Sequence, residues 1–203
     1  MKNKERTVDL AIIGGTGSKI SLENIEQIKV YTPYGSPSAA ITIGDFEGRK
    51  LAYIPRHGID HSIPPHKINF RANIWALKNL GVKFIISPSA VGSLKKTHNK
   101  GKFILVDQYM DRTKKRTETF YEGGQLCHIG QADPYCEYLN HLFLETGQKM
   151  NLNIQEGGVY ICIEGPRFST RAESKMFRQW GGDIVGMTTY PEVVLSAEKE
   201  ICY

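Results

Sequence analysis

The sequence predicts an α/β fold: a mixed, mostly parallel twisted sheet flanked by helices. Apolar runs of strand length alternate with amphipathic stretches of helix length along the chain, which is typical of a parallel sheet covered by helices. The chain has 203 residues, enough for one such domain and short for two. We therefore expect residues 1–203 to form a single domain.

Strands are predicted where apolar residues form short runs. The first run is Val8 to Ile13. Ala39 to Ile43 and Leu51 to Ile54 flank a turn at residues 45–48 and predict a hairpin. The remaining strand-length runs are Lys83 to Ile86, Phe103 to Val106, Val159 to Ile163 and Asp183 to Val185.

Helices are predicted between these strands. From Ile68 to Leu80, apolar residues share one face, and Gly81 ends the helix. Tyr135 to Met150 predicts a second helix. Its apolar stripe consists of Tyr135, Leu139, Leu142 and Phe143. Thr170 to Trp180 predicts a third helix, and Pro191 begins a fourth that runs to Lys199.

The last residues, Ile201-Cys202-Tyr203, predict the opening of a further buried strand, although strands usually run to about five or six residues. A helix that crosses over a parallel sheet normally delivers the chain to another strand. We therefore expect a core that is incomplete at the C-terminus.

The composition argues against several classes of partner. The net charge is +5, and the densest basic patch is Lys114-Lys115-Arg116, which lacks the interleaved aromatic residues of a nucleic-acid-binding surface. We interpret this patch as a solvated loop and expect an anionic small molecule, with no nucleic acid, as the partner. No segment approaches the roughly 18 consecutive apolar residues of a membrane span, and the first residues contain no signal-peptide core. We expect a cytoplasmic protein that contacts no membrane.

The cysteines predict no disulfide framework. They form no C-x-x-C pair and are too sparse for such a framework. They are Cys127, Cys136, Cys162 and Cys202. Reduced thiols are expected, and pairing among the last three of them stays open.

The glycine turn Gly14-Gly15-Thr16-Gly17 directly follows the first predicted strand. It is no Walker loop, since no Gly-Lys-Ser/Thr closes it, and no dinucleotide fingerprint, since Ile20 stands where the third glycine belongs. Small residues in such a turn can direct backbone N–H groups and the Thr16 hydroxyl toward a phosphate. An ordinary structural turn explains the same residues, so both interpretations stay open at this point.

Arg56 and His57 follow the end of another predicted strand, where α/β folds hold their ligands. A guanidinium fork matches phosphate oxygens well. His57, His61 and His66 also suggest a metal site, but Gly58 and the prolines before His66 prevent a single helix from presenting them together, and their spacing matches no zinc pattern. An anion site is therefore favoured over a metal site.

Three more polar, glycine-bearing loops follow predicted strands. They are "SPSAVGSL" from Ser87, "IEGPRFSTRAES" from Ile163 and "GMTTYPEV" from Gly186. Taken singly, each is explained as a polar loop or a helix cap. Because parallel strands bring their carboxyl ends to one edge of a sheet, we expect the five loops to converge on one ligand site.

Together, these motifs resemble the 5′-methylthioadenosine phosphorylases, in the trimeric branch of the purine nucleoside phosphorylase superfamily. The similarity covers "AIIGGTG", "PRHGIDH", "SAVGSL", "EGPRFSTRAES" and "GMTTYPEVVLSAEKEICY" and runs from about Val8 to Tyr203. The resemblance implies phosphorolysis of 5′-methylthioadenosine to adenine and 5-methylthioribose 1-phosphate, in purine and methionine salvage. It implies inorganic phosphate as co-substrate, no metal or organic cofactor, and a homotrimer or homohexamer.

The resemblance also assigns site residues. Those expected around phosphate are Thr16, Arg56, His57, Ser89, Ala90 and Thr188. Phe168 and Ser169 are expected beside the base and Met187 against the ribose. His61 and His128 are expected near the 5′ end of the sugar, with His128 reaching in from a neighbouring subunit.

In the family, an Asp pair that protonates the leaving base follows the strand that begins at Ile201. The resemblance therefore places the catalytic acid beyond Tyr203, with the final strand and the C-terminal helix absent from this chain. The residues that distinguish aminopurines from oxopurines belong to the same region. A 6-oxopurine nucleoside phosphorylase, acting on methylthioinosine, inosine or guanosine, is therefore the alternative within the class. A non-catalytic remnant that binds nucleoside or phosphate is the alternative from another class.

Overall fold

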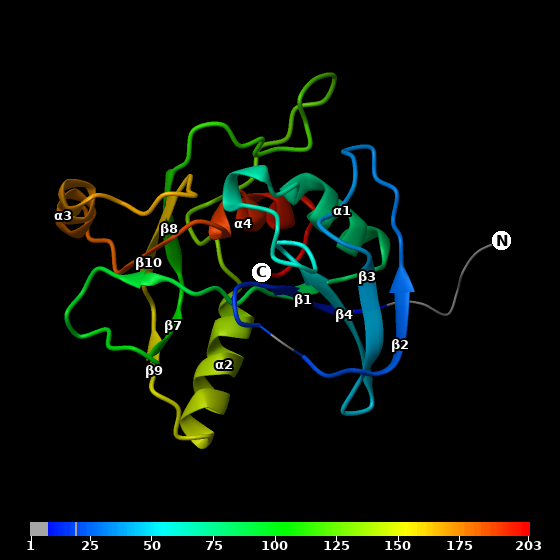
Figure 1. The fold of residues 1–203 in the computed structure, drawn as a ribbon, viewed down its shortest axis with the longest axis horizontal. Helices are drawn as coiled ribbons and strands as arrows, with labels where there is room; N and C mark the ends of the chain where they lie inside the picture. Colours follow the sequence, from blue (N-terminus) through cyan, green and yellow to red (C-terminus); the bar gives the residue numbers. More distant parts are fainter. Residues whose placement is uncertain (1–7, 19) are drawn as a thin grey trace.

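The computed structural model describes residues 8–18 and 20–203, and the strands of this part form three sheets (Figure 1). The largest sheet has the order β2-β3-β4-β1-β5. Its strands are β1 (Leu10–Gly14), β2 (Glu23–Ile28), β3 (Ile41–Phe46), β4 (Arg49–Pro55) and β5 (Phe84–Ile86). The second sheet has the order β6-β11-β10-β8. Its strands are β6 (Gly92–Ser93), β8 (Gln108–Arg112), β10 (Val159–Ile163) and β11 (Ile184–Gly186).

The smallest sheet pairs β7 (Phe103–Leu105) with β9 (Ile154–Glu156). The helical segments are η1 (Pro65–Lys67), α1 (Phe70–Asn79), α2 (Glu137–Lys149), α3 (Arg171–Gln179) and α4 (Thr189–Glu198). Each of the predicted helices and strands is present, and their ends either agree or shift by a few residues.

The predicted mixed, mostly parallel α/β class is confirmed, but the single sheet that we expected is divided into three. β1 pairs in parallel with β4 and β5, β10 pairs in parallel with β8 and β11, and β7 pairs in parallel with β9. The predicted hairpin is present because β3 and β4 pair in antiparallel fashion up to Phe46 and Arg49. β2 and β6 provide the other antiparallel pairings.

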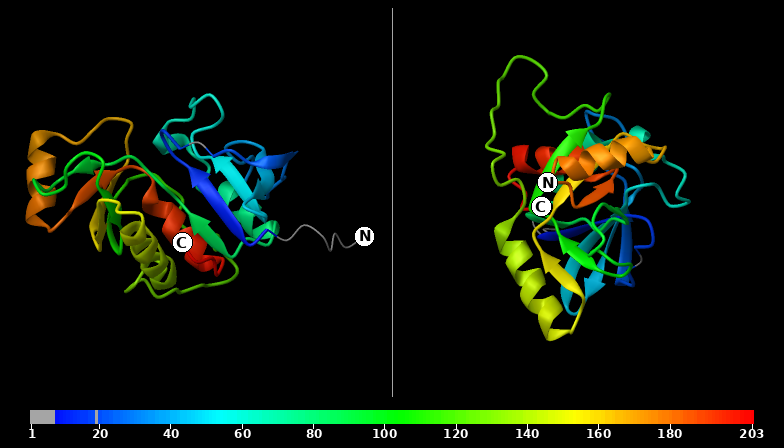
Figure 2. Two further views of the ribbon diagram at one scale, coloured as in Figure 1. Left: turned by 90° about the horizontal axis from the view of Figure 1, so that it is seen from below. Right: turned by 90° about the vertical axis from the view of Figure 1, so that its left-hand side faces the viewer.

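Helix α4 joins the two larger sheets. It packs against α1 and also contacts β10, and Figure 1 shows it between these sheets. Its Leu195 belongs to the same buried core as Ile13 of β1, Ile54 of β4 and Ile85 of β5. In the left view of Figure 2, the second sheet and α3 lie at one end of the molecule and β2–β4 at the other. The first turn of α4 is therefore held between the carboxyl ends of strands from two sheets.

The start of α4 is irregular. Tyr190 has φ −108° and ψ 132°, and Pro191 also departs from helical dihedrals. The regular helix therefore begins after Pro191, one residue later than the predicted start. Thr189 precedes this irregularity, and Thr188 is the N-cap residue.

The apolar stripe predicted on α2 is only partly buried. Leu139 and Gly147 are the buried residues of this helix, whereas Leu142 is 45% exposed and Phe143 36% exposed. The reason is that α2 packs mainly against the small sheet of β7 and β9, which is too narrow to cover the whole stripe, although Tyr138 of α2 also lies near Phe84 of β5.

The last residues of the chain align beside β5. Cys202 forms an isolated parallel bridge with Phe84, and the Ile85 N–H donates to the Cys202 carbonyl at 2.8 Å. This agrees with the predicted opening of a strand. Cys202 is also joined to Cys136 by a disulfide across a Cα–Cα distance of 5.3 Å. The expectation of reduced thiols is wrong for this pair, since the two residues are 66 positions apart and only the fold brings them together.

The solvated-loop interpretation of the basic patch holds for Lys114 and Lys115, which are exposed, but is wrong for Arg116. The Arg116 side chain is 3% exposed and forms an ion pair with Glu164 at 3.3 Å. It also donates to the carbonyls of Ile163 and Tyr190. Arg116 therefore ties this loop to β10 and to the start of α4. Within the described ranges, no helix is long and apolar enough to cross a membrane.

Candidate functional site

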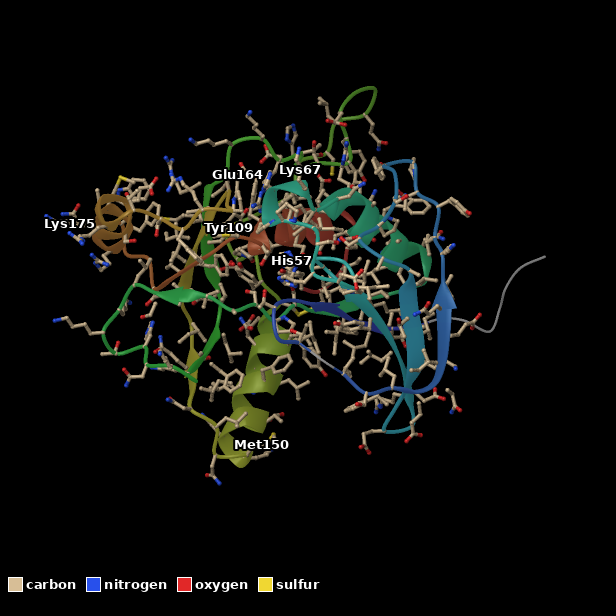
Figure 3. The ribbon with its side chains drawn as sticks, viewed as in Figure 1. His57, Lys67, Tyr109, Met150, Glu164 and Lys175 are labelled. Carbon is tan, nitrogen blue, oxygen red and sulfur yellow. A yellow bond between two sulfur atoms is a disulfide. The ribbon has the colours of Figure 1, made fainter. Side chains whose placement is uncertain are left out.

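The five loops singled out in the sequence line one cavity of about 600 Å³. The loops follow β1, β4 and β5 of the largest sheet and β10 and β11 of the second sheet, so the cavity lies where the two sheets meet. The residues predicted for phosphate all line it, and they are Thr16, Arg56, His57, Ser89, Ala90 and Thr188. Figure 3 shows His57 near the centre of the molecule, far from Lys175 of α3 and Met150 at the end of α2.

The glycine turn after β1 approaches the loop after β5 very closely. A Cβ atom on Gly15 would lie 2.6 Å from the Pro88 carbonyl oxygen and 2.8 Å from Arg56 Nη1, closer than real Cβ atoms come. Glycine is therefore required at this position. The turn then carries Thr16 to the cavity, where its Oγ1 lies 3.4 Å from His61 Nε2.

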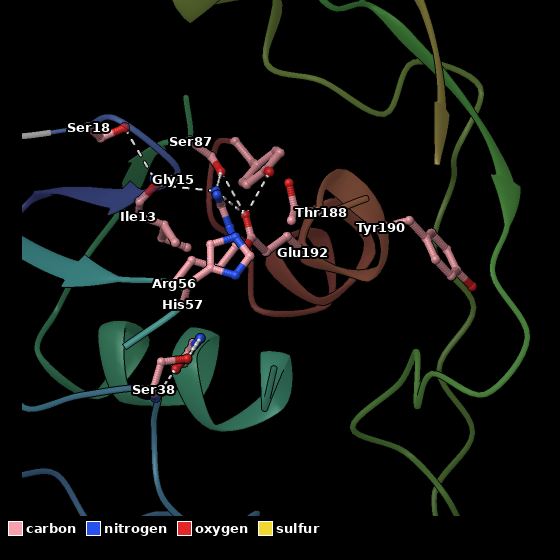
Figure 4. Close-up of polar contacts among 12 residues, drawn as sticks. Ile13, Gly15, Ser18, Ser38, Arg56, His57, Ser87, Thr188, Tyr190 and Glu192 are labelled. Atoms are coloured by element: carbon pink, nitrogen blue, oxygen red, sulfur yellow. Dashed lines mark hydrogen bonds and ion pairs between the residues drawn. The ribbon is translucent and has the colours of Figure 1, made fainter. Parts of the chain in front are cut away.

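Arg56 is the most buried polar residue of the cavity, at 1% exposure. Its Nε donates to Glu192 Oε1 at 2.5 Å, and its Nη2 donates to Glu192 Oε2 at 3.2 Å. Nη2 also donates to the Ile13 carbonyl at 3.2 Å and to Ser87 Oγ. Figure 4 shows Arg56 between the end of β1 and Glu192 of α4. Arg56 Nη1 is buried and has no hydrogen-bond partner in the described part of the chain.

The guanidinium of Arg56 remains charged in this buried position. Burial opposes the charge, but the carboxylate of Glu192 outweighs it, so that the pKa of Arg56 is raised. A buried donor without a partner costs about 1–3 kcal/mol, more when it is charged. An anion in the cavity would supply the missing acceptor for Nη1.

His57 is uncharged near neutral pH. It is 7% exposed, and its Nδ1 lies 2.8 Å from the Ile63 carbonyl oxygen, which fixes Nδ1 as the protonated nitrogen. Burial lowers the pKa of His57 and the charge of Arg56 adds to this effect, although the Ile63 carbonyl opposes it. The ring of His61 lies beside it with a centroid distance of 4.5 Å. Across residues 8–18 and 20–203, no group of three His, Cys, Asp or Glu side chains is arranged to hold a metal ion.

We expect an NMR pH titration to show His57 with a midpoint below its ordinary value of 6.5. Saturating sulfate, which remains a dianion throughout the titration, should raise that midpoint because an adjacent anion favours the imidazolium form. His57→Asn assigns the resonance, and His66→Asn, outside the cavity, is the control. A midpoint at or above 6.5 in the sulfate-free protein would contradict the burial effect.

Most of the residues predicted for the nucleoside also line this cavity. They are Phe168, Ser169, Met187 and His61. Phe168 is 84% exposed and therefore presents its ring at the rim. Ser169 Oγ lies 2.8 Å from Ser174 Oγ. His128 is exposed and does not line the cavity within this single chain, so its contribution to a neighbouring subunit stays a prediction.

Two functional candidates were missed in the sequence. Glu192 is 0% exposed and pairs with Arg56, but an acidic residue in the first turn of a helix is usually explained by the helix dipole. Tyr160 is 2% exposed, and its hydroxyl accepts a hydrogen bond from the Thr188 N–H at 3.4 Å. Its place in an apolar strand predicts only a core residue. No local signal identifies either role.

Comparisons with known proteins agree with this geometry. A family model described as "Phosphorylase superfamily" matches residues 9–203. S-methyl-5′-thioadenosine phosphorylase of Thermofilum pendens is 52% identical over 198 residues, which are 97% of this chain and 76% of the relative. The protein of that name from Pyrococcus furiosus is 53% identical over 96% of this chain and 75% of its own length.

Solved structures give the same result. A methylthioadenosine phosphorylase sourced from an antarctic soil metagenomic library superimposes with a TM-score of 0.92 and 42% identity, over 98% of this chain and 71% of the other. Methylthioadenosine phosphorylase from Schistosoma mansoni in complex with adenine superimposes with a TM-score of 0.93 and 34% identity, over 97% of this chain and 79% of the other.

Proposed function

The chain belongs to the phosphorylase superfamily, and we propose that the cavity between its two larger sheets is the site at which it cleaves 5′-methylthioadenosine with inorganic phosphate. The products are adenine and 5-methylthioribose 1-phosphate. The observation that carries this proposal is the buried, charged Nη1 of Arg56, which has no partner among the described residues and lies at a cavity shared by the five loops. The names of the relatives supply the nucleoside.

Phosphate, held as an anion beneath the sugar, stabilises the positively charged transition state of the reaction. Cleavage of the C1′–N9 bond leaves its electron pair on adenine and positive charge on the sugar, and a nearby anion lowers the energy of that state. A phosphate oxygen then forms the new bond to C1′ from a fixed position. The departing adenine takes up a proton at N7. The described residues that line the cavity include neither Asp nor Glu, and we assign none of them to this proton transfer.

The cavity offers a distinct group to each part of the substrates. Arg56 Nη1, the hydroxyls of Thr16, Ser89 and Thr188, and the backbone N–H of Ala90 would donate to phosphate. His57 would contact it through Nε2. Phe168 and Ser169 would lie beside adenine and Met187 against the ribose, while His61 reaches the 5′ end of the sugar. In this assignment no metal or organic cofactor takes part.

We also propose a homo-oligomer, either a trimer or a hexamer, in which His128 of one subunit completes the 5′ end of a neighbouring site. His128 is exposed and lies on the segment between β8 and α2. No described residue of this segment lines the cavity of its own chain, which supports a contact in trans.

The function is tested by incubating the purified chain with 5′-methylthioadenosine, with and without inorganic phosphate. We expect adenine to be released only when phosphate is present, and methylthioinosine, the 6-oxopurine counterpart, to be cleaved more slowly. Faster cleavage of methylthioinosine would move the assignment to the oxopurine enzymes. Phosphate binding without release of either base would instead identify a non-catalytic binding protein.

A further inference from the structure

We propose that Glu192 is a positioning residue for phosphate, which acts by clamping Arg56 so that Nη1 alone faces the cavity. The inference rests on the proposed function for the identity of the anion. Its basis is the arrangement of hydrogen bonds around one buried guanidinium. The donors on one edge of this group are paired within the protein, whereas Nη1 on the other edge is not paired with any described residue.

The clamp occupies one edge of the guanidinium. Glu192 accepts from Nε at 2.5 Å and from Nη2 at 3.2 Å, a two-pronged pairing that fixes both the plane and the rotation of the group. The Ile13 carbonyl and Ser87 Oγ take up the remaining capacity of Nη2. The other edge, with Nη1, is left without a partner among the described residues.

Glu192 is itself held rigidly. Its Oε2 accepts from Ser87 Oγ at 2.7 Å and from the Tyr203 hydroxyl at 2.9 Å, and its side chain is 0% exposed. It lies in the first regular turn of α4, directly after Pro191. The carboxylate therefore has one available position, and the position of Arg56 follows from it.

The free edge points toward the proposed phosphate loops. Arg56 Nη1 lies 2.8 Å from the site of an imagined Gly15 Cβ, and Ser89 Cα lies 3.5 Å from the same point. Neutralising a buried arginine would require only a nearby carboxylate in any orientation. The observed pairing instead selects which nitrogen remains free and aims it between the loops after β1 and β5.

The test is Glu192→Asp, which keeps the negative charge and withdraws the carboxylate by one methylene group. A misplacement on this scale can lower the reaction rate by up to about 100-fold. We expect the apparent Michaelis constant for phosphate (the phosphate constant) to rise about tenfold, and that for 5′-methylthioadenosine (the nucleoside constant) to stay unchanged within about twofold. In an Arg56→Lys background, the same change at Glu192 should no longer alter the phosphate constant, because the two residues act as one unit.

Glu198→Asp is the matched control. Glu198 belongs to the same helix, and its carboxylate accepts from Thr119 Oγ1 at 2.6 Å and from the Phe120 N–H at 2.8 Å, away from Arg56. This control should leave both substrate constants unchanged. If Glu192→Asp does not fold, Ser87→Ala tests the same clamp with a smaller expected rise of about threefold in the phosphate constant.

Binding of inorganic phosphate alone, followed as the rise in melting temperature, separates this inference from the proposed function. If the wild type releases no adenine but phosphate stabilises it more than Glu192→Asp, the positioning role stands and the proposed function fails. If the wild type releases adenine but Glu192→Asp has the same phosphate constant as Glu198→Asp, the positioning role is overturned. Equal rises in the phosphate and nucleoside constants, or an undiminished effect in the Arg56→Lys background, also overturn it.

Discussion

Arg56→Ala is expected to raise the apparent Michaelis constant for phosphate about 100-fold, while the Michaelis constant for the nucleoside changes by no more than about threefold. A hydrogen bond from a charged group contributes about 1.5–3 kcal/mol, and each 1.4 kcal/mol or so corresponds to a factor of ten. Arg56 Nη1 is a buried charged donor at the cavity, without a partner in residues 8–18 and 20–203, so its removal acts on the anion. Steady-state kinetics with each substrate varied in turn measures the two constants.

Stability must be measured on the same variant, because Arg56→Ala also leaves the buried Glu192 without its cation. Breaking a buried pair in this way costs about 3–5 kcal/mol, so the assays should be made at a temperature where circular dichroism shows folded protein. Arg71→Ala is the matched control, since Arg71 pairs with Glu122 outside the cavity. Equal rises in the phosphate and nucleoside constants would argue against the assigned role of Arg56.

Gly186→Ala is expected to destabilise the protein by about 3 kcal/mol, at the upper end of overpacking effects, and to reduce phosphate binding sharply. A Cβ atom at this position would lie 1.9 Å from the Tyr160 hydroxyl oxygen and 2.5 Å from Tyr160 Cζ. Tyr160 is 2% exposed, so relieving this overlap requires a buried ring to move. Because its hydroxyl also accepts from the Thr188 N–H, any displacement is passed to the phosphate loop. Thermal unfolding with and without phosphate measures both effects.

Gly123→Ala is the control for this substitution, since an added Cβ at Gly123 meets nothing within 4 Å. It should leave the melting temperature and the phosphate response unchanged. Tyr160→Phe in the Gly186→Ala background removes the closest atom of the clash and should recover part of the lost stability. A Gly186→Ala protein as stable as Gly123→Ala would contradict the packing described for β10 and β11.

The fold was predictable where apolar patterns are strong. The run at Val159–Ile163 became β10 without a shift, and Pro191 predicted the start of the regular part of α4 to within one residue. Strands β2, β6, β8 and β9 were missed. Of these, β2 (Glu23–Ile28) is an edge strand with mostly exposed residues, so it carries no apolar period. The division into three sheets was not predictable either, because partners such as β7 and β9 are chosen by long-range packing.

The cavity was predictable as a set of loops, because strand ends followed by glycine and hydroxyl residues stand out in the sequence. The hydrogen bonds and ion pairs between its side chains were not predictable. Arg56 and Glu192 are 136 positions apart, and each has an ordinary local explanation at its own place in the chain. The burial of Arg116 escaped prediction for the same reason, since a run of basic residues usually indicates an exposed loop.

The disulfide between Cys136 and Cys202 makes the denatured polypeptide a lariat rather than an open string. Thr188 and Glu192 belong to its ring, whereas Thr16, Arg56 and Ser89 belong to its tail. Closing a ring of this size removes about 4 kcal/mol of chain entropy from the denatured ensemble in the loop-closure description. The cross-link restricts only the ring in the denatured state, so the tail, which supplies Thr16, Arg56 and Ser89, loses its full chain entropy when the anion pocket forms.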